Sequence, residues 1–267
     1  MNNTAPIGIF DSGLGGLTVL KTLKKMLPNE SFIYFGDTAH VPYGSKSPDT
    51  IIKYSEHIID FFLNHNTKAI IIACNTASSV AYNKLKDKYT IPLFDVVSPS
   101  VKYTINQSKT KNVGVIGTIS TINSKAYSKQ FYNKNSNFCI YEIACPLFVP
   151  IIEEGWQNTQ IAKDTAKIYL SNFNNKNIDT LILGCTHYPI MSNTIKSIIP
   201  YDIKMIFSGE TLGYILSNFL NNKSLLNQSN NAPKIQYYVS DLPNKFDILG
   251  SQFLGEKLTN IKKISIL

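Results

Sequence analysis

The sequence predicts an α/β protein with two similar lobes, each a mostly parallel sheet flanked by helices. Short runs rich in Ile, Val, Phe and Leu recur along the chain, each followed by turn-forming residues and a helix-like stretch, which is typical of βα units. These runs also form two sets that match one another, as duplicated units do. We therefore expect a pseudo-twofold relation between the lobes and an active site in the cleft between them.

The expected strands of the first set cover residues 7–10, 32–35, 69–73 and 93–96, and those of the second cover 113–116, 139–144, 180–184 and 204–207. In the match between the sets, Gly8 aligns with Gly114 and Phe32 with Cys139. Chance similarity among apolar strands is the alternative explanation. A duplication predicts two four-stranded units with the same strand order.

The C-terminal segment, residues 208–267, is too short to form a core of its own. It holds a helix pattern at 210–220, a polar Asn/Ser stretch at 221–231 and a strand-like run at 235–239. We expect it to return and complete the first lobe. The predicted lobes are therefore residues 1–97 with 208–267, and residues 98–207.

Composition excludes several classes of protein. With 267 residues, 43% of them hydrophobic and 16% charged, the chain is not disordered, collagen-like or a coiled coil. No apolar run approaches the roughly 18 residues that a membrane span needs. We expect a soluble cytoplasmic protein without a membrane partner, and the sequence leaves its oligomeric state open, with a homodimer as one option.

The net charge of +8 does not by itself predict a nucleic-acid partner. All 26 basic residues are lysines, scattered along the chain, so the bidentate contacts that arginine makes with guanine edges and phosphates are absent. A lysine-coated surface exposed to solvent is the simpler interpretation. We expect no nucleic-acid partner.

The glycine-rich turn over residues 11–16 does not fit a nucleotide-binding loop. A dinucleotide fingerprint that starts at Gly13 and Gly15 needs glycine where Thr18 stands, and no G-K-S/T sequence forms a phosphate loop. A tight turn into a helix accounts for the glycines. It does not explain Asp11 and Ser12.

The four cysteines are Cys74, Cys139, Cys145 and Cys185. They are too few and too dispersed for a disulfide framework, and none forms a CxxC pair, so neither disulfides nor bound metal are expected. An isolated cysteine is usually a buried structural residue. The chemical interest lies in the positions of two of them.

Cys74 and Cys185 occupy equivalent positions in the two repeats, at the carboxyl end of a strand and the start of a helix. Ligands of parallel sheets bind at such strand ends. A helix N-terminus stabilises a thiolate and can lower the cysteine pKa below about 8.5. Two thiols facing each other across one carbon describe a two-base racemase or epimerase.

The residues beside these cysteines suit an amino-acid substrate. Ser12, Asn75, Thr76 and Thr186 are compact donors that can hold a carboxylate without arginine. Asp11 can orient a cationic amine or tune a thiol, and His187 can assist Cys185 or be an ordinary satisfied polar residue.

Seven motifs together resemble glutamate racemase, and they extend over essentially the whole chain. They are D-S-G-L-G-G-L at 11–17, V-P-Y-G-S at 41–45, A-C-N-T-A at 73–77, P-L-F-V-P-I-I-E-E-G at 146–155, L-G-C-T-H-Y-P at 183–189, V-S-D-L-P-N-K-F at 239–246 and F-L-G at 253–255. Each motif alone is weak, and the combination is specific.

The resemblance implies an isomerase that interconverts L- and D-glutamate without a cofactor and supplies D-glutamate for peptidoglycan. It makes Cys74 and Cys185 the two proton donors and acceptors, with Cys74 acting on D-glutamate and Cys185 on L-glutamate. Implied substrate contacts are Asp11, Ser12, Tyr43, Gly44, Asn75, Thr76, Thr186 and His187. Because the chain has no arginine, we expect neutral donors to hold both carboxylates of glutamate, with Asn75, Thr76 and Thr186 on one and Tyr43, Gly44 and Ser45 near the other. Glu153 matches a carboxylate that supports the histidine, and the neighbouring Glu154 is the alternative.

Two residues depart from the family pattern. His40 stands where arginine or asparagine is common, and Phe207 replaces a polar residue.

Two other functions stay open. A racemase for aspartate or another small acid shares the paired cysteines. A two-lobed binding protein without catalysis has no need of them.

Overall fold

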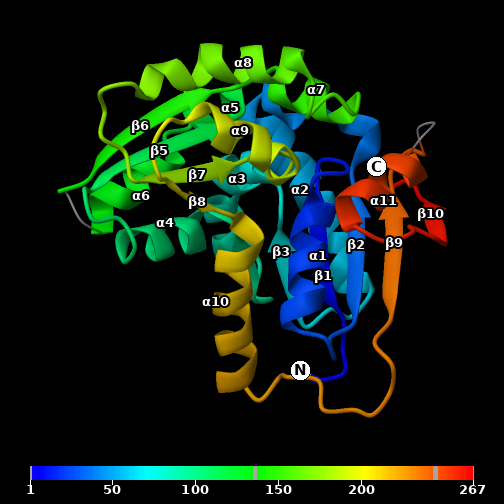
Figure 1. The fold of residues 1–267 in the computed structure, drawn as a ribbon. Coiled ribbons are helices and arrows are strands. Elements are labelled where there is room, and N and C mark those ends of the chain that lie inside the picture. Colours follow the sequence, from blue (N-terminus) through cyan, green and yellow to red (C-terminus); the bar gives the residue numbers. More distant parts are fainter. Residues whose placement is uncertain (1, 135–136, 243–245, 267) are drawn as a thin grey trace.

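The computed structural model describes residues 2–134, 137–242 and 246–266. Residues 243–245, inside the motif over 239–246, lie outside the described part. Two sheets of parallel strands, each flanked by helices, form two lobes side by side (Figure 1), which confirms the predicted fold class. No described helix is long and apolar enough to cross a membrane.

The first sheet has the strand order β10-β9-β2-β1-β3-β4, and every described pair in it is parallel. Its strands are β1 (Ile7–Asp11), β2 (Phe32–Gly36), β3 (Ala69–Ile72), β4 (Leu93–Asp95), β9 (Ile235–Val239) and β10 (Ile261–Lys263). The second sheet has the order β6-β5-β7-β8. Its strands are β5 (Asn112–Gly117), β6 (Cys139–Ala144), β7 (Thr180–Gly184) and β8 (Lys204–Ile206).

The order β2-β1-β3-β4 recurs as β6-β5-β7-β8, as a duplicated unit requires. The predicted alignment of β2 with β6 is wrong by one residue. Gly8 pairs with Ile33 whereas Gly114 pairs with Tyr141, so Tyr141 is the counterpart of Ile33 and Ile140 that of Phe32. Because side chains alternate between faces, a one-residue shift moves each side chain to the opposite face of the sheet.

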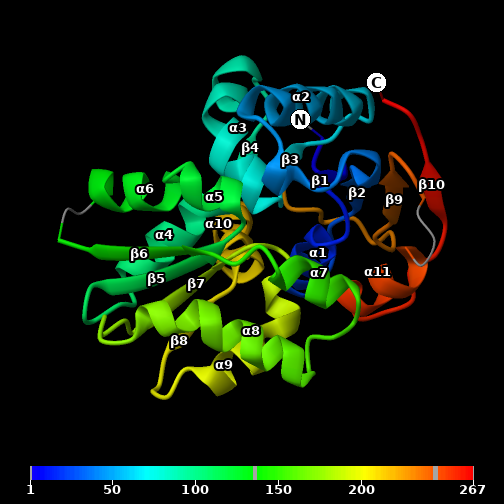
Figure 2. The ribbon, with the colours of Figure 1, turned by 90° about the horizontal axis from the view of Figure 1, so that it is seen from above.

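Helices cover both faces of each sheet (Figure 2). In the first lobe they are α1 (Gly16–Met26), α2 (Pro48–Asn64), α3 (Asn75–Lys88), α10 (Ser208–Asn222) and α11 (Phe246–Leu254). In the second they are α4 (Val97–Ile105), α5 (Ile119–Asn123), α6 (Ala126–Lys134), α7 (Phe148–Glu153), α8 (Gln160–Leu170) and α9 (Ser192–Ile198). Short 3₁₀ turns are η1 (Thr38–His40), η2 (Tyr43–Ser45), η3 (Ser171–Phe173) and η4 (Tyr188–Met191).

Alternate residues of β1 supply two different cores. Ile7 and Ile9 pack in the apolar cluster that contains the buried face of α1, whereas Phe10 packs with the buried residues of α2 and α3. Such a strand, buried on both faces, reads in sequence as a continuous apolar run. The covered faces explain why the apolar runs alone located eight strands.

The C-terminal segment packs against elements of the first lobe. α10 packs along α1, β9 pairs with β2, and β10 adds a further strand beside β9 (Figure 1). The two connections between lobes lead into α4 and α10, where Ser100 Oγ and Thr211 Oγ1 lie 3.2 Å apart. We propose residues 1–97 with 208–267, and 98–207, as the two lobes, because both boundaries fall at the start of these helices.

A buried ion pair joins the base of the first lobe to the segment after α10. Lys68 Nζ lies 2.5 Å from Glu30 Oε2, with side chains that are 0% and 2% exposed. It also donates to the carbonyl oxygen of Leu225 at 2.8 Å, and Glu30 Oε1 accepts the amide of Asn227. The pair therefore fixes three separate segments of chain.

We expect Lys68→Met to lower the free energy of unfolding by about 3–5 kcal/mol, because it leaves the Glu30 carboxylate buried and unpaired. Urea unfolding measures the effect. Lys84→Met is the control, since Lys84 lies 3.9 Å from Asp49 in an exposed pair and should change little. Equal midpoints for the two variants would contradict the prediction.

Candidate active site

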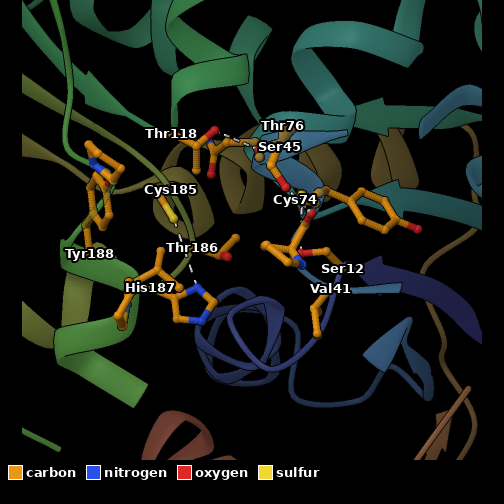
Figure 3. Close-up of a pocket in the computed structure, with 18 of the residues that line it drawn as sticks. Ser12, Val41, Ser45, Cys74, Thr76, Thr118, Cys185, Thr186, His187 and Tyr188 are labelled. Carbon is orange, nitrogen blue, oxygen red and sulfur yellow. Dashed lines mark hydrogen bonds between the residues drawn. The ribbon is translucent and has the colours of Figure 1, made fainter. Parts of the chain in front are cut away.

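One cavity of about 310 Å³ receives the residues that follow the carboxyl ends of strands from both sheets (Figure 3). Both candidate cysteines line it. Its walls are Ser12, Gly13, Leu14, Val41, Pro42, Tyr43, Gly44, Ser45, Cys74, Asn75, Thr76, Thr118, Ile119, Cys145, Pro146, Val149, Pro150, Glu153, Cys185, Thr186, His187 and Tyr188. The predicted site residues therefore meet in one place, except for Asp11.

Cys74 caps the N-terminus of α3. Its sulfur accepts the amide of Ala77 at 3.5 Å and lies 3.8 Å from Ser12 Oγ. Burial and the nearby Asp11 raise the pKa of this thiol to about 12, and the two hydrogen bonds offset only part of the rise. The expectation that the helix N-terminus lowers this pKa is thus wrong for Cys74, which is a protonated thiol at neutral pH.

Cys185 follows β7 and is buried, but an α-helix does not start there. The 3₁₀ turn η4, with Pro189 among its first residues, comes between the strand and α9. The equivalence with Cys74 therefore holds for the strand end and not for the helix. The charged environment of Cys185 comes from side chains instead.

His187 lies between Cys185 and Glu153. Its Nδ1 is 4.0 Å from the cysteine sulfur, and its Nε2 is 3.0 Å from Glu153 Oε1. Burial alone would lower the pKa of His187, but the interactions with Cys185 and Glu153 raise it to about 10. Glu153 is thus the carboxylate that meets the histidine, and Glu154 is exposed without a described contact to it.

Asp11 lies behind the cavity wall. It is fully buried, and its carboxylate accepts the amide of Gly13 at 3.0 Å and the hydroxyl of Thr186 at 3.3 Å. Burial raises the pKa of Asp11, while the charge of His187 and these hydrogen bonds oppose the rise. Asp11 therefore joins the end of β1 to the residue after Cys185.

The loop over residues 41–45 lines the cavity, but the Tyr43 hydroxyl is bound to a residue outside the wall. That hydroxyl donates to Asp37 Oδ2 at 2.5 Å. Asp37 Oδ1 also accepts from Ser240 and lies 2.7 Å from Nδ1 of His40. His40 thus supports the loop from behind, and the Ser45 hydroxyl lies 3.4 Å from the Pro42 carbonyl oxygen.

Asn75 and Thr76 contact groups from the second lobe. The side-chain nitrogen of Asn75 donates to Tyr127 Oη at 2.9 Å and to Ser208 Oγ at 3.3 Å, which leaves Oδ1 buried without a partner. Thr76 Oγ1 lies 2.9 Å from Thr118 Oγ1. We expected the Asn75 side chain to donate to a substrate carboxylate, but in the structure its nitrogen already donates to Tyr127 and Ser208. Phe207, the residue before Ser208, is partly buried against the larger apolar cluster and does not line the cavity.

Sequence reasoning missed several wall residues of the second lobe. Thr118 follows β5 as Ser12 follows β1, so the alignment of Gly8 with Gly114 already contained the signal for it. Cys145 follows the end of β6 in the same way. Val149 and Pro150 lie on α7, inside the motif over 146–155, but as apolar side chains they carry no catalytic or binding pattern of their own. No group of three or more His, Cys, Asp or Glu side chains that could hold a metal occurs in the described part of the chain.

We expect the stability contributed by His187 to depend on pH. A pKa raised from 6.5 to about 10 in the folded state means that the protonated imidazole stabilises the fold fully below about pH 6.5. This stabilisation is lost as the pH rises through about 10. Urea unfolding of the wild type and of His187→Asn should therefore differ most near pH 6 and least near pH 10. A difference that does not change with pH would contradict the shift.

Comparison with known proteins identifies close sequence relatives. Residues 7–208 match the family described as Asp/Glu/Hydantoin racemase. The chain is 43% identical over 260 residues to the glutamate racemase of Geobacter metallireducens, which covers 97% of this chain and 96% of that protein. It is 40% identical over 262 residues to the glutamate racemase of Neisseria meningitidis, which covers 98% and 97%.

Solved structures agree with the sequence relatives. Glutamate racemase from Francisella tularensis, in complex with D-glutamate, superposes with a TM-score of 0.93 at 43% identity, covering 99% of this chain and 98% of that one. A glutamate racemase isoform from Bacillus anthracis gives a TM-score of 0.94 at 31% identity, with the same coverage. The aspartate racemase of Picrophilus torridus shares the fold, with a TM-score of 0.59 at 19% identity over 81% of this chain and 95% of that one.

Proposed function

The chain belongs to the Asp/Glu/hydantoin racemase family, and we propose that it interconverts L- and D-glutamate by a two-cysteine proton transfer. One observation carries the proposal. Cys74 and Cys185, which follow equivalent strands of the two sheets, line the same cavity. A cavity with a thiol from each lobe can place one acid/base group on each face of a substrate carbon.

The surroundings of the two cysteines differ. Burial and the nearby Asp11 raise the pKa of Cys74, which favours the protonated thiol, whereas Nδ1 of His187 lies 4.0 Å from the Cys185 sulfur. The reaction from L-glutamate starts from a Cys185 thiolate and a Cys74 thiol: the Cys185 sulfur removes the α-hydrogen and the Cys74 thiol delivers its proton to the opposite face. The product is D-glutamate, and the reverse reaction starts from the Cys74 thiolate and the Cys185 thiol.

The α-hydrogen is far less acidic than a thiol, so the site must stabilise carbanion character at the α-carbon. An enclosed cavity with fixed donors strengthens electrostatic interactions with the developing charge. We propose that Ser12, Asn75, Thr76, Thr186 and His187 contact the substrate together with the loop residues Tyr43, Gly44 and Ser45. Asp11 acts from behind the wall, through Thr186 and Gly13, and Glu153 acts through His187.

Glutamate is the favoured substrate over aspartate. The relatives from Geobacter metallireducens and Neisseria meningitidis, at 43% and 40% identity, are glutamate racemases, whereas the aspartate racemase shares only the fold. The proposed reaction uses the two thiols and no cofactor. It would supply D-glutamate for peptidoglycan synthesis in the cytoplasm.

The test is an assay of α-hydrogen exchange and inversion with L- and D-glutamate and with both aspartates, in deuterated water that contains EDTA. We expect racemisation of glutamate without pyridoxal phosphate, and protection by glutamate against thiol-alkylating reagents, because bound substrate should cover both sulfurs. Activity that needs pyridoxal phosphate or a divalent metal, or that survives complete alkylation of Cys74 and Cys185, would overturn the proposal. Preferential racemisation of aspartate would show that aspartate is the substrate and would leave the two-thiol mechanism in place.

A further inference from the structure

Tyr127, on α6 of the second lobe, lies between the two strand ends that carry the cysteines. Its hydroxyl accepts the side-chain amide of Asn75, the residue after Cys74, at 2.9 Å. Its ring packs on Gly184, the residue before Cys185, since a Cβ added there would lie 3.3 Å from ring atom Cε2. Tyr127 is fully buried and is not part of the cavity wall.

We propose that Tyr127 is a positioning residue for racemisation, which orients the Asn75 amide at the cavity wall through its hydroxyl. The inference rests on the proposed glutamate racemase function and concerns the same site. Tyr127 touches no reacting atom in this arrangement. It acts through Asn75, which lines the cavity.

Two hydrogen bonds fix the orientation of the Asn75 amide. Both side-chain N–H groups are engaged, one toward Tyr127 and one toward Ser208. The oxygen Oδ1 is buried and is the only polar side-chain atom of Asn75 without a partner. An unpaired buried acceptor is costly unless a ligand supplies a donor. The group of an amino acid that supplies N–H donors is its α-ammonium.

An ammonium contact predicts a particular kinetic effect. The ammonium stays cationic while the α-carbon loses its proton, so the contact should be equally strong in the bound substrate and in the transition state. Interactions of this kind change KM and leave kcat nearly constant. A residue that only stabilises the fold would lower the amount of active protein and leave KM unchanged.

The experiment is Tyr127→Phe, which keeps the ring on Gly184 and removes only the hydroxyl. We expect KM for glutamate to rise about 3- to 10-fold, the usual effect of one neutral hydrogen bond, with kcat within about twofold of wild type. Ser208→Ala, which removes the second partner of the same amide, should shift KM in the same direction. Tyr82→Phe is the matched control. The hydroxyl of Tyr82 donates a long hydrogen bond to the Leu93 carbonyl oxygen, at 3.4 Å, away from the cavity wall, so this substitution should change neither KM nor kcat.

A double-mutant cycle separates action through Asn75 from a general effect. If Tyr127 acts through Asn75, the Tyr127→Phe substitution should have no further effect on KM in an Asn75→Ala protein. The same KM change in both backgrounds, or unchanged kinetics of Tyr127→Phe in an active wild type, would overturn the inference alone. A wild type that does not racemise glutamate would overturn the proposed function together with it.

Discussion

Replacing either Cys74 or Cys185 with serine should lower racemisation by about 10³-fold or more in both directions, with little change in stability. Each turnover needs one sulfur to remove a proton and the other to deliver one, so neither cysteine can replace its partner. An alcohol is a much weaker acid than a thiol, and general acid–base groups contribute about 10²- to 10⁴-fold to rates. Circular dichroism at constant enzyme concentration measures the loss.

The two variants should differ in the exchange that they retain. With Cys74→Ser, Cys185 can still remove the α-hydrogen of L-glutamate and return deuterium to the same face, so exchange without inversion should be faster for L- than for D-glutamate. Cys185→Ser should show the opposite preference. The exposed Cys139 supplies the control, since Cys139→Ser should retain full activity. Wild-type racemisation by either active-site variant would refute the two-base assignment.

The fold was largely predictable because the inner strands β1, β2, β3, β5 and β7 are buried on both faces. A strand covered by helices on both sides must be apolar along its length, so its sequence stands out. β10 was missed for the opposite reason. It consists of Ile261, Lys262 and Lys263 at the edge of the first sheet, where two largely exposed lysines give no strand signal. The register error in β6 has a similar origin, because this edge strand is only partly covered.

Candidate site residues could be found where a rule of topology applies. Parallel strands end at the same edge of a sheet, and this places Ser12, Cys74, Thr118 and Cys185 around one cavity without knowledge of the packing. The orientation of a side chain follows no such rule. That the Tyr43 hydroxyl turns to Asp37 depends on a residue that the sequence pattern did not mark. The raised pKa of Cys74 depends on burial and on Asp11, which are tertiary features.

Gly15 is also expected to be sensitive to substitution, although it is only the residue before α1. Its backbone is helical, with φ −57° and ψ −37°, so alanine introduces no backbone strain. A Cβ at this position would, however, lie 2.1 Å from Thr186 Oγ1 and 2.5 Å from Nδ1 of His187. The methyl group must therefore displace Thr186 and His187, the two residues that directly follow Cys185.

Gly15→Ala should therefore lower kcat by about 10²-fold, because displacements of about 1 Å near a reacting centre have effects of this size. Gly213→Ala is the matched control: its Cβ would lie 2.3 Å from the sulfur of Met26, far from the cavity, and a flexible thioether can move aside. Steady-state kinetics and thermal unfolding of both variants separate the two effects. The prediction fails if Gly15→Ala keeps the wild-type kcat, or if Gly213→Ala loses as much activity at equal stability. The first result would mean that Thr186 and His187 can move without consequence for Cys185, and the supporting role of the Glu153–His187 pair would have to be abandoned. The second would mean that the loss does not come from displacing these two side chains.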